Sequence, residues 1–105
     1  MTEKIFKYTL EIKKIDEDNH TFLSLPRGAK VLSAATQYEQ IVVYAVVNPD
    51  EKVMEDHEFI VQGTGHVIKF DKFEYEFLNT TSLYDGKLMF HIFHGIVPIQ
   101  ERGVI

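Results

Sequence analysis

Hydrophobic and polar residues alternate along several stretches of this chain, most clearly between residues 70 and 77. Aromatic residues occupy positions 73, 75 and 77, and charged residues occupy positions 72, 74 and 76. A period of two places the two sets of side chains on opposite faces of a β-strand. The pattern therefore predicts a strand over residues 67–78, with one apolar face and one solvated face.

Other stretches predict further strands. Residues 5–13 alternate in the same way. Residues 40–47 are rich in β-branched side chains, and residues 87–94 are apolar at nearly every position, which is typical of strands covered on both faces. Shorter extended segments are predicted at residues 20–25 and 58–62.

Residues 29–37 are open to two interpretations. Their alanines favour a helix, whereas Val31, Leu32 and the preceding turn favour a strand that pairs with residues 20–25. That turn, at residues 25–28, has proline where a type I turn prefers its second residue and glycine at the fourth. We therefore predict a strand.

Polar residues, proline and glycine predict the breaks between these strands. The breaks are expected at residues 16–19, 48–50, 63–65, 79–82 and 85–86. Five to seven strands joined by short turns predict an all-β fold, either a small antiparallel sandwich or a partly open barrel. We expect residues 1–105 to form a single domain, with residues 96–105 as a C-terminal appendage.

Composition narrows the chemistry that this domain can perform. With 105 residues, of which 45% are hydrophobic, the chain is able to build a core without disulfides or a structural metal. It contains no cysteine, which excludes disulfides, thiolate zinc sites and cysteine nucleophiles.

The charge balance bears on the class of partner. Sixteen acidic and eleven basic residues give a formal net charge of −5, which disfavours non-specific binding to a nucleic-acid backbone.

The N-terminus lacks the apolar stretch of a signal peptide, and no run approaches the roughly 20 apolar residues that cross a bilayer. We expect a cytoplasmic protein that does not associate with membranes.

The histidines and glutamates do not predict a metal site or an enzyme. His91 and His94 are three positions apart, which places them on opposite faces of a strand. The remaining histidines come from three other segments, at positions 20, 57 and 66. Glu74 and Glu76 share a face, but the alternation explains them as the solvated side of a strand. No nucleophile elbow frames any serine, so we expect no catalytic residues, no cofactor and no metal.

Two segments are candidates for binding an anion. Gly63, Thr64, Gly65 and His66 combine flexible backbone N–H groups with a hydroxyl and an imidazole, a composition that suits a phosphate. Arg27 lies at a turn tip and Lys30 follows it closely. We therefore take these as the candidate ligand-binding residues: Arg27, Lys30, Gly63, Thr64, Gly65 and His66. In each segment a plain tight turn is the alternative interpretation.

Several motifs resemble an uncharacterised family of small proteins encoded by bacteriophages and their bacterial hosts. The most specific are the L-P-x-G-A-x-x-L-S segment over residues 25–33 and the G-T-G-H segment over residues 63–66. The resemblance extends over about residues 7–94. It implies no established activity, but it implies a setting in which small acidic phage proteins bind host factors or sequester signalling molecules.

The sequence therefore leaves two functional hypotheses open. The first is a non-enzymatic phage-type binding module in the host cytoplasm, with countering of host defence as its expected role. It would bind a host protein or a small anionic ligand such as a nucleotide, and act as a homo-oligomer. The second is a structural or virion-associated domain that contacts another protein and has no ligand.

Overall fold

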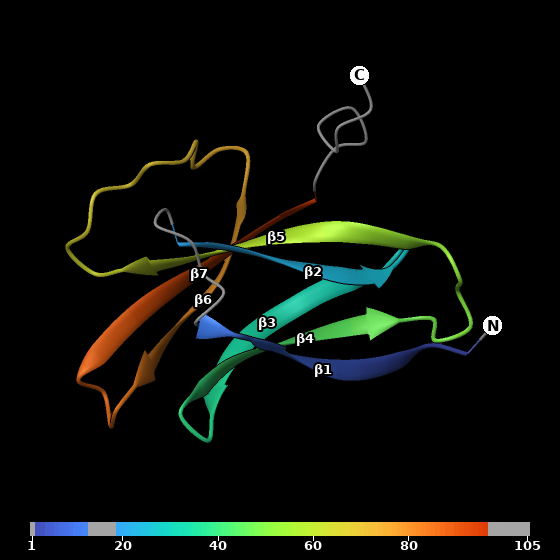
Figure 1. The fold of residues 1–105 in the computed structure, drawn as a ribbon, viewed down its shortest axis with the longest axis horizontal. Helices are drawn as coiled ribbons and strands as arrows, with labels where there is room; N and C mark the ends of the chain where they lie inside the picture. The colour runs from blue at the N-terminus through green and yellow to red at the C-terminus, as the bar shows by residue number, and fades with distance from the viewer. Residues whose placement is uncertain (1, 13–18, 97–105) are drawn as a thin grey trace.

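The computed structural model describes residues 2–12 and 19–96, which form seven β-strands and no α-helix (Figure 1). The strands are β1 (Lys4–Leu10), β2 (His20–Pro26), β3 (Lys30–Gln37), β4 (Gln40–Val47), β5 (Met54–Gly63), β6 (Glu76–Leu83) and β7 (Leu88–Ile96). All of the strand pairs are antiparallel. The predicted all-β class is confirmed.

The strands form two sheets that do not close into a barrel. One sheet has three strands in the order β1-β4-β3, and the other has four in the order β2-β5-β7-β6. The turn after Pro26 carries the chain from the second sheet to the first. The segment at residues 29–37 is therefore a strand, β3, as predicted. The predicted pairing with residues 20–25 is wrong, because β3 pairs with β4 and β2 belongs to the other sheet.

The core lies between the facing sides of the two sheets. Strand β4 contributes every second residue to it, which is the period of two expected of a strand. The buried apolar residues of the core come from all seven strands and include Leu10, Leu25, Val31, Ala34, Ile41, Val43, Ala45, Val47, Phe59, Val61, Leu83 and Ile92. Burial also raises the pKa of the Tyr8 hydroxyl at the margin of this core.

The two central strands of the four-stranded sheet have apolar side chains on both faces. Val61 pairs with Ile92 on the inner face, and Ile60 pairs with Phe93 on the outer face. Val61, Ile92 and Ile60 are all buried. Residues 87–94 were predicted to form a strand that is covered on both faces, and strand β7 occupies this region.

Strands β3 and β6 lie beside one another where the two sheets meet, and Asn79 connects them. Its Nδ2 donates to the carbonyl of Ala34 at 2.7 Å, and its Oδ1 accepts from the backbone N–H of Ala34 at 2.6 Å. The side-chain amide therefore takes the place that a neighbouring strand would take along this edge of β3.

Two threonines extend the same connection. The Thr36 hydroxyl donates to the carbonyl of Ser82, and the Thr36 and Thr81 hydroxyl oxygens are 2.6 Å apart. The predicted break at residues 79–82 is therefore wrong. These polar residues belong to β6, and the side chains of Asn79 and Thr81 bond to the facing sheet.

The predicted strand over residues 67–78 is also wrong. Residues 64–75 form a loop, and β6 begins only at Glu76. Asp71 turns the chain here, because its carboxylate accepts from the N–H of Phe73 at 3.0 Å and its carbonyl accepts from the N–H of Glu74 at 3.0 Å. Asx turns of this kind compete with strand pairing.

Two other strand boundaries differ from the predictions. Strand β5 begins at Met54 rather than at residue 58, because it pairs with β2 over all seven residues of that strand. Strand β1 ends at Leu10. Residues 13, 16–18 and 97–105, which figured in the predicted first strand, first turn and appendage, lie outside the described residues. Within the described part of the chain, no helix is long and apolar enough to span a bilayer.

The Asn79 bridge generates a prediction about stability. Asn79→Ala leaves the buried N–H of Ala34 without its acceptor, and we expect a loss of about 1–3 kcal/mol in the free energy of unfolding. Urea denaturation of the purified domain measures this change.

Asn48→Ala is the matched control. It removes a local, exposed hydrogen bond, in which the Asn48 side chain accepts from the N–H of Asp50 at 3.0 Å. We expect this change to cost less than about 0.5 kcal/mol. Equal losses in the two variants would show that the Asn79 amide does not connect the sheets.

Candidate functional site

The two segments that were predicted to bind an anion lie at opposite ends of β5. Arg27 is beside the start of this strand, since its N–H donates to the carbonyl of Val53 at 2.8 Å. Gly63 is the last residue of the strand, ten residues long, and Thr64, Gly65 and His66 follow it. Ten extended residues span about 30 Å, so the two predicted groups do not form one site.

Carboxylates surround the predicted cations. Arg27 Nη2 lies 3.7 Å from Glu51 Oε1. Lys30 lines a groove of about 420 Å³ together with Glu74, Glu76 and His94. Negative charges beside each cation lower its attraction for an anionic ligand.

The loop at Gly63–His66 forms its hydrogen bonds within the protein. The N–H of Thr64 donates to the carbonyl of Met89 at 3.3 Å, and the N–H of His66 donates to the carbonyl of Gly63 at 3.2 Å. The Thr64 hydroxyl lies 2.7 Å from His91 Nε2. Gly65 has φ +87°, which explains the need for glycine there. The geometry is that of a tight turn with two of its N–H groups in use.

This turn opens the loop of residues 64–75, which we call the strap (Figure 1, the yellow-to-orange loop between β5 and β6). Its first part is tied to β5 by one side chain. Gln62 Nε2 donates to the carbonyl of His66 at 3.0 Å and to that of Val67 at 3.3 Å. The strap is longer than most loops between strands, and loops of such length are commonly functional.

Aromatic rings anchor the rest of the strap on the outer face of the four-stranded sheet. The Phe70 ring packs against Phe93 of β7, with centroids 5.0 Å apart, and against Tyr75 at 5.5 Å. The Tyr75 hydroxyl donates to Glu58 of β5 at 2.6 Å. Gly95 leaves room for the Tyr75 ring, because a Cβ at this position would lie 2.9 Å from Tyr75 Cδ1.

The strap exposes three apolar side chains among its polar ones. Phe73 is 87% exposed, and Val67 and Ile68 are exposed as well. The Lys72 ammonium lies 5.3 Å from the centroid of the Phe73 ring, a cation–π contact. Specific contacts therefore hold the strap on the sheet, while Val67, Ile68 and Phe73 are exposed to solvent.

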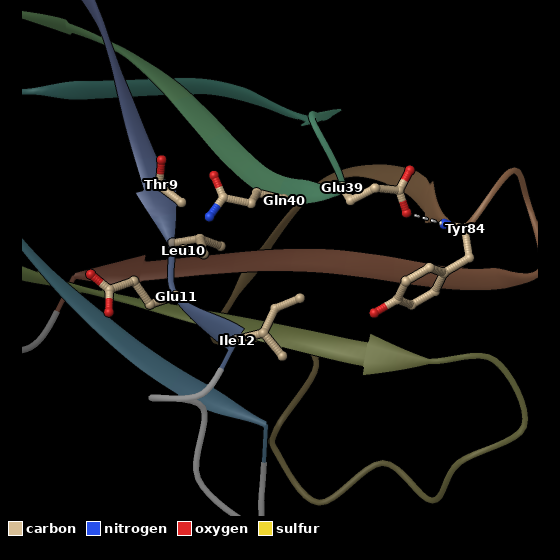
Figure 2. Close-up of a pocket in the computed structure, with 7 residues that line it drawn as sticks. All are labelled: Thr9, Leu10, Glu11, Ile12, Glu39, Gln40 and Tyr84. Carbon is tan, nitrogen blue, oxygen red and sulfur yellow. Dashed lines mark hydrogen bonds between the residues drawn. The ribbon is translucent and has the colours of Figure 1, made fainter.

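A separate hollow of about 770 Å³ lies where the β3–β4 and β6–β7 turns meet the end of β1 (Figure 2). Tyr38 and Glu39 form the first turn with φ of 51° and 60°, the conformation of a two-residue type I′ hairpin. This turn places Glu39 so that its carboxylate accepts from the N–H of Tyr84 at 2.8 Å. Glu11 and Glu39 both line the hollow, so its charge also opposes an anion.

Two histidines that are far apart in the sequence meet at the inner face of the four-stranded sheet. His57 Nδ1 and His94 Nε2 are 2.7 Å apart, the ring planes lie within 12° of each other with centroids 5.0 Å apart, and both side chains are buried. His94 Nδ1 bonds to Glu76 Oε1 at 2.7 Å. The sequence alone predicts isolated histidines here, because positions 57 and 94 belong to separate segments. One feature of the sequence places them on the inner face. His57 lies two positions from Phe59 and His94 lies two positions from Ile92, and side chains two positions apart on a strand share a face.

His91 does not join this pair. It lies on the outer face, where Nδ1 bonds to the Thr80 hydroxyl at 2.8 Å, so the predicted separation of His91 and His94 is confirmed.

In the described residues, no group of three or more histidine and acidic side chains is arranged to hold a metal ion. Glu74 precedes β6 and Glu76 bonds to His94, so the two glutamates do not form the predicted solvated face of one strand.

A family model described as a domain of unknown function, DUF7352, matches residues 1–103, nearly the whole chain. The chain belongs to the DUF7352 family. No curated protein and no solved structure gave a significant match. Membership of DUF7352 agrees with the expectation of a family whose activity is not characterised, and the site of this DUF7352 domain must be judged on its geometry.

The seat of Tyr75 generates a prediction about the strap. Gly95→Ala places a methyl group against a ring that Phe70 and Glu58 hold in position, so we expect the strap to detach from the sheet. Overpacking of this kind costs about 1–3 kcal/mol. Limited proteolysis will show faster cleavage within residues 64–75, and thermal denaturation will show a lower Tm.

Gly63→Ala is the control for this experiment. Its Cβ would lie 2.8 Å from His66 Nδ1, an equally close contact, but the exposed His66 side chain is able to turn away. We expect little change in cleavage. A Gly95→Ala variant with wild-type resistance to protease would contradict the anchoring role of Tyr75.

Proposed function

We propose that this domain is a non-enzymatic binding module and that the strap is the surface that contacts a partner protein. One observation carries the proposal: the strap is fixed to the sheet by Gln62, Phe70 and Tyr75, yet it presents Val67, Ile68 and Phe73 to solvent. Exposed apolar side chains on an ordered loop suit a protein interface, in which buried aromatic residues contribute most of the affinity.

Pre-organisation supports the same proposal. A loop that is already held in one conformation loses less conformational entropy on binding than a flexible one. Asp71 adds to this order, because its two hydrogen bonds fix the turn that presents Phe73. The partner that fits is a protein with an apolar pocket that is able to receive an aromatic ring.

Charge favours a protein partner over a small anionic ligand such as a nucleotide. Glu51 lies beside Arg27, Glu74 and Glu76 lie beside Lys30, and two of the N–H groups of residues 63–66 donate within the protein. Binding of an anion at Arg27, Lys30, Gly63, Thr64, Gly65 and His66 stays a prediction without support from the geometry.

Two contacts of His94 support a non-enzymatic role. Its ring is buried, and its two nitrogens bond to Glu76 and His57. A general acid or base must reach a substrate, and this imidazole faces protein groups on both sides.

The setting that we propose is the bacterial cytoplasm during phage infection, with a host protein as the partner and countering of host defence as the outcome. The support for this setting is the resemblance carried by residues 25–33 and 63–66. A homo-oligomer is part of the same proposal, because a second copy would cover apolar surface that one copy leaves exposed.

Affinity capture from a bacterial lysate tests the role of the strap. Phe73→Asn removes the most exposed ring of the strap without touching its anchors. We expect the amount of captured partner to fall about tenfold or more, as for the loss of a central aromatic residue in an interface. Quantitative mass spectrometry of the captured proteins measures the change.

Tyr38→Asn is the matched control, because Tyr38 is 90% exposed and lies on the β3–β4 turn, away from the strap. Asparagine also tolerates the positive φ of this position. The proposal predicts that Tyr38→Asn captures the same proteins as the wild type. It is overturned if Phe73→Asn does so too, or if millimolar cyclic or linear nucleotides raise the Tm of the wild type.

A further inference from the structure

His57 and His94 form a buried pair with charged groups around it. His57 belongs to β5 and His94 to β7, and both side chains are more than nine-tenths buried. Glu76 of β6 bonds to His94 Nδ1 at 2.7 Å, and Glu55 Oε1 lies 3.6 Å from His57 Nε2. The groove beside His94 is also lined by Lys30 of β3 and Glu74 of the strap. Strand β2 places Leu23 opposite His57.

Only one hydrogen atom can lie between the two facing nitrogens of the rings. A distance of 2.7 Å between His57 Nδ1 and His94 Nε2 requires that one nitrogen donates and the other accepts. A neutral imidazole has one N–H and one acceptor nitrogen, whereas a protonated imidazole has two N–H groups and no acceptor. The contact therefore tolerates one protonated ring in the pair, with the other ring neutral, but not two.

We propose that His57 and His94 form an acid-sensitive latch between β5 and β7. One proton added to the pair leaves the contact intact, with Glu55 and Glu76 balancing its charge. A second proton turns the contact into two N–H groups that face one another, and the two positive rings separate. Acid also neutralises the carboxylates, which removes the charge that would balance a second imidazolium.

The other described histidine contacts tolerate acid. His91 bonds to the hydroxyls of Thr64 and Thr80, and a hydroxyl oxygen accepts from an N–H as readily as it donates. His20 pairs with the Glu58 carboxylate, an acceptor to which both the neutral and the protonated imidazole are able to donate. Acid therefore acts selectively at the latch and not at the histidines of the outer face.

Opening of the latch would also disturb the residues next to the Tyr75 anchor of the strap. Glu76 is the first residue of β6 and directly follows Tyr75, the last anchor of the strap. Gly95, which leaves room for the Tyr75 ring, is the neighbour of His94. The latch is a property of the fold and does not depend on what the strap binds.

An NMR titration of the full chain from about pH 7 to about pH 4 tests the latch. Ring ¹⁵N shifts report which nitrogens carry protons, and NOEs between the rings report their contact. We expect the NOEs to persist while one proton is added and to vanish when both rings are protonated. Amide exchange of Phe93 and His94, corrected for intrinsic rates, then gives the equilibrium constant for opening of the latch. We expect this constant to rise about tenfold for each unit by which the pH falls, because opening takes up one proton.

Two variants make the test specific. His57→Phe keeps an aromatic ring at this position but has no nitrogen to protonate, so the opening constant should lose its dependence on pH. His20→Gln changes a histidine of the outer face and should keep the wild-type dependence. The proposal is overturned if both rings carry two protons while the NOEs persist, if wild-type opening does not depend on pH, or if His57→Phe keeps the dependence. Should His57→Phe fail to fold, the wild-type titration decides alone.

Discussion

The central constraint on this fold is that the two middle strands of the four-stranded sheet are apolar on both faces. Val61 and Ile92 face inward, and Ile60 and Phe93 face outward. Exposure of a buried side chain of this size costs about 1.5–3 kcal/mol, so neither face is stable in water. The three-stranded sheet covers the inner face. The strap lies on the outer face, and its Phe70 packs on Phe93. The loop that we propose as the interface is therefore also part of the fold.

Coverage of the inner face requires the two sheets to stay in register, and polar side chains achieve this at the junction of β3 and β6. Asn79 bonds to both backbone groups of Ala34, and Thr36 bonds to Thr81 and Ser82. Apolar contacts in the core have little directional preference, whereas these hydrogen bonds do. They define which residues of the two edges face one another. Strand β6 is thereby held at two points, by Asn79 near its middle and by Glu76 at its start.

Period-two patterns identified the all-β class and most of the strands because those strands bury one face against the core. They failed between residues 67 and 82 for two physical reasons. The aromatic residues at 70 and 75 are covered by packing onto the sheet as a loop, and local alternation does not distinguish this from a strand. The polar run from Asn79 to Ser82 resembles a turn, but the partners of Asn79, Thr81 and Ser82 lie 45 or more residues away on β3. The His57–His94 pair was missed because only the register of β5 against β7 brings the two rings together.

Site-specific photo-crosslinking in living bacteria tests the role of the strap most directly. A benzophenone amino acid is placed at position 73 in one sample and at position 38 in another. These positions have nearly equal exposure but lie on different surfaces, since Phe73 belongs to the strap and Tyr38 to the β3–β4 turn. If the strap is the contact surface, position 73 gives a discrete adduct with another protein and position 38 gives none. The same adduct pattern at both positions, or no adduct at position 73, would show that the strap is not the contact surface.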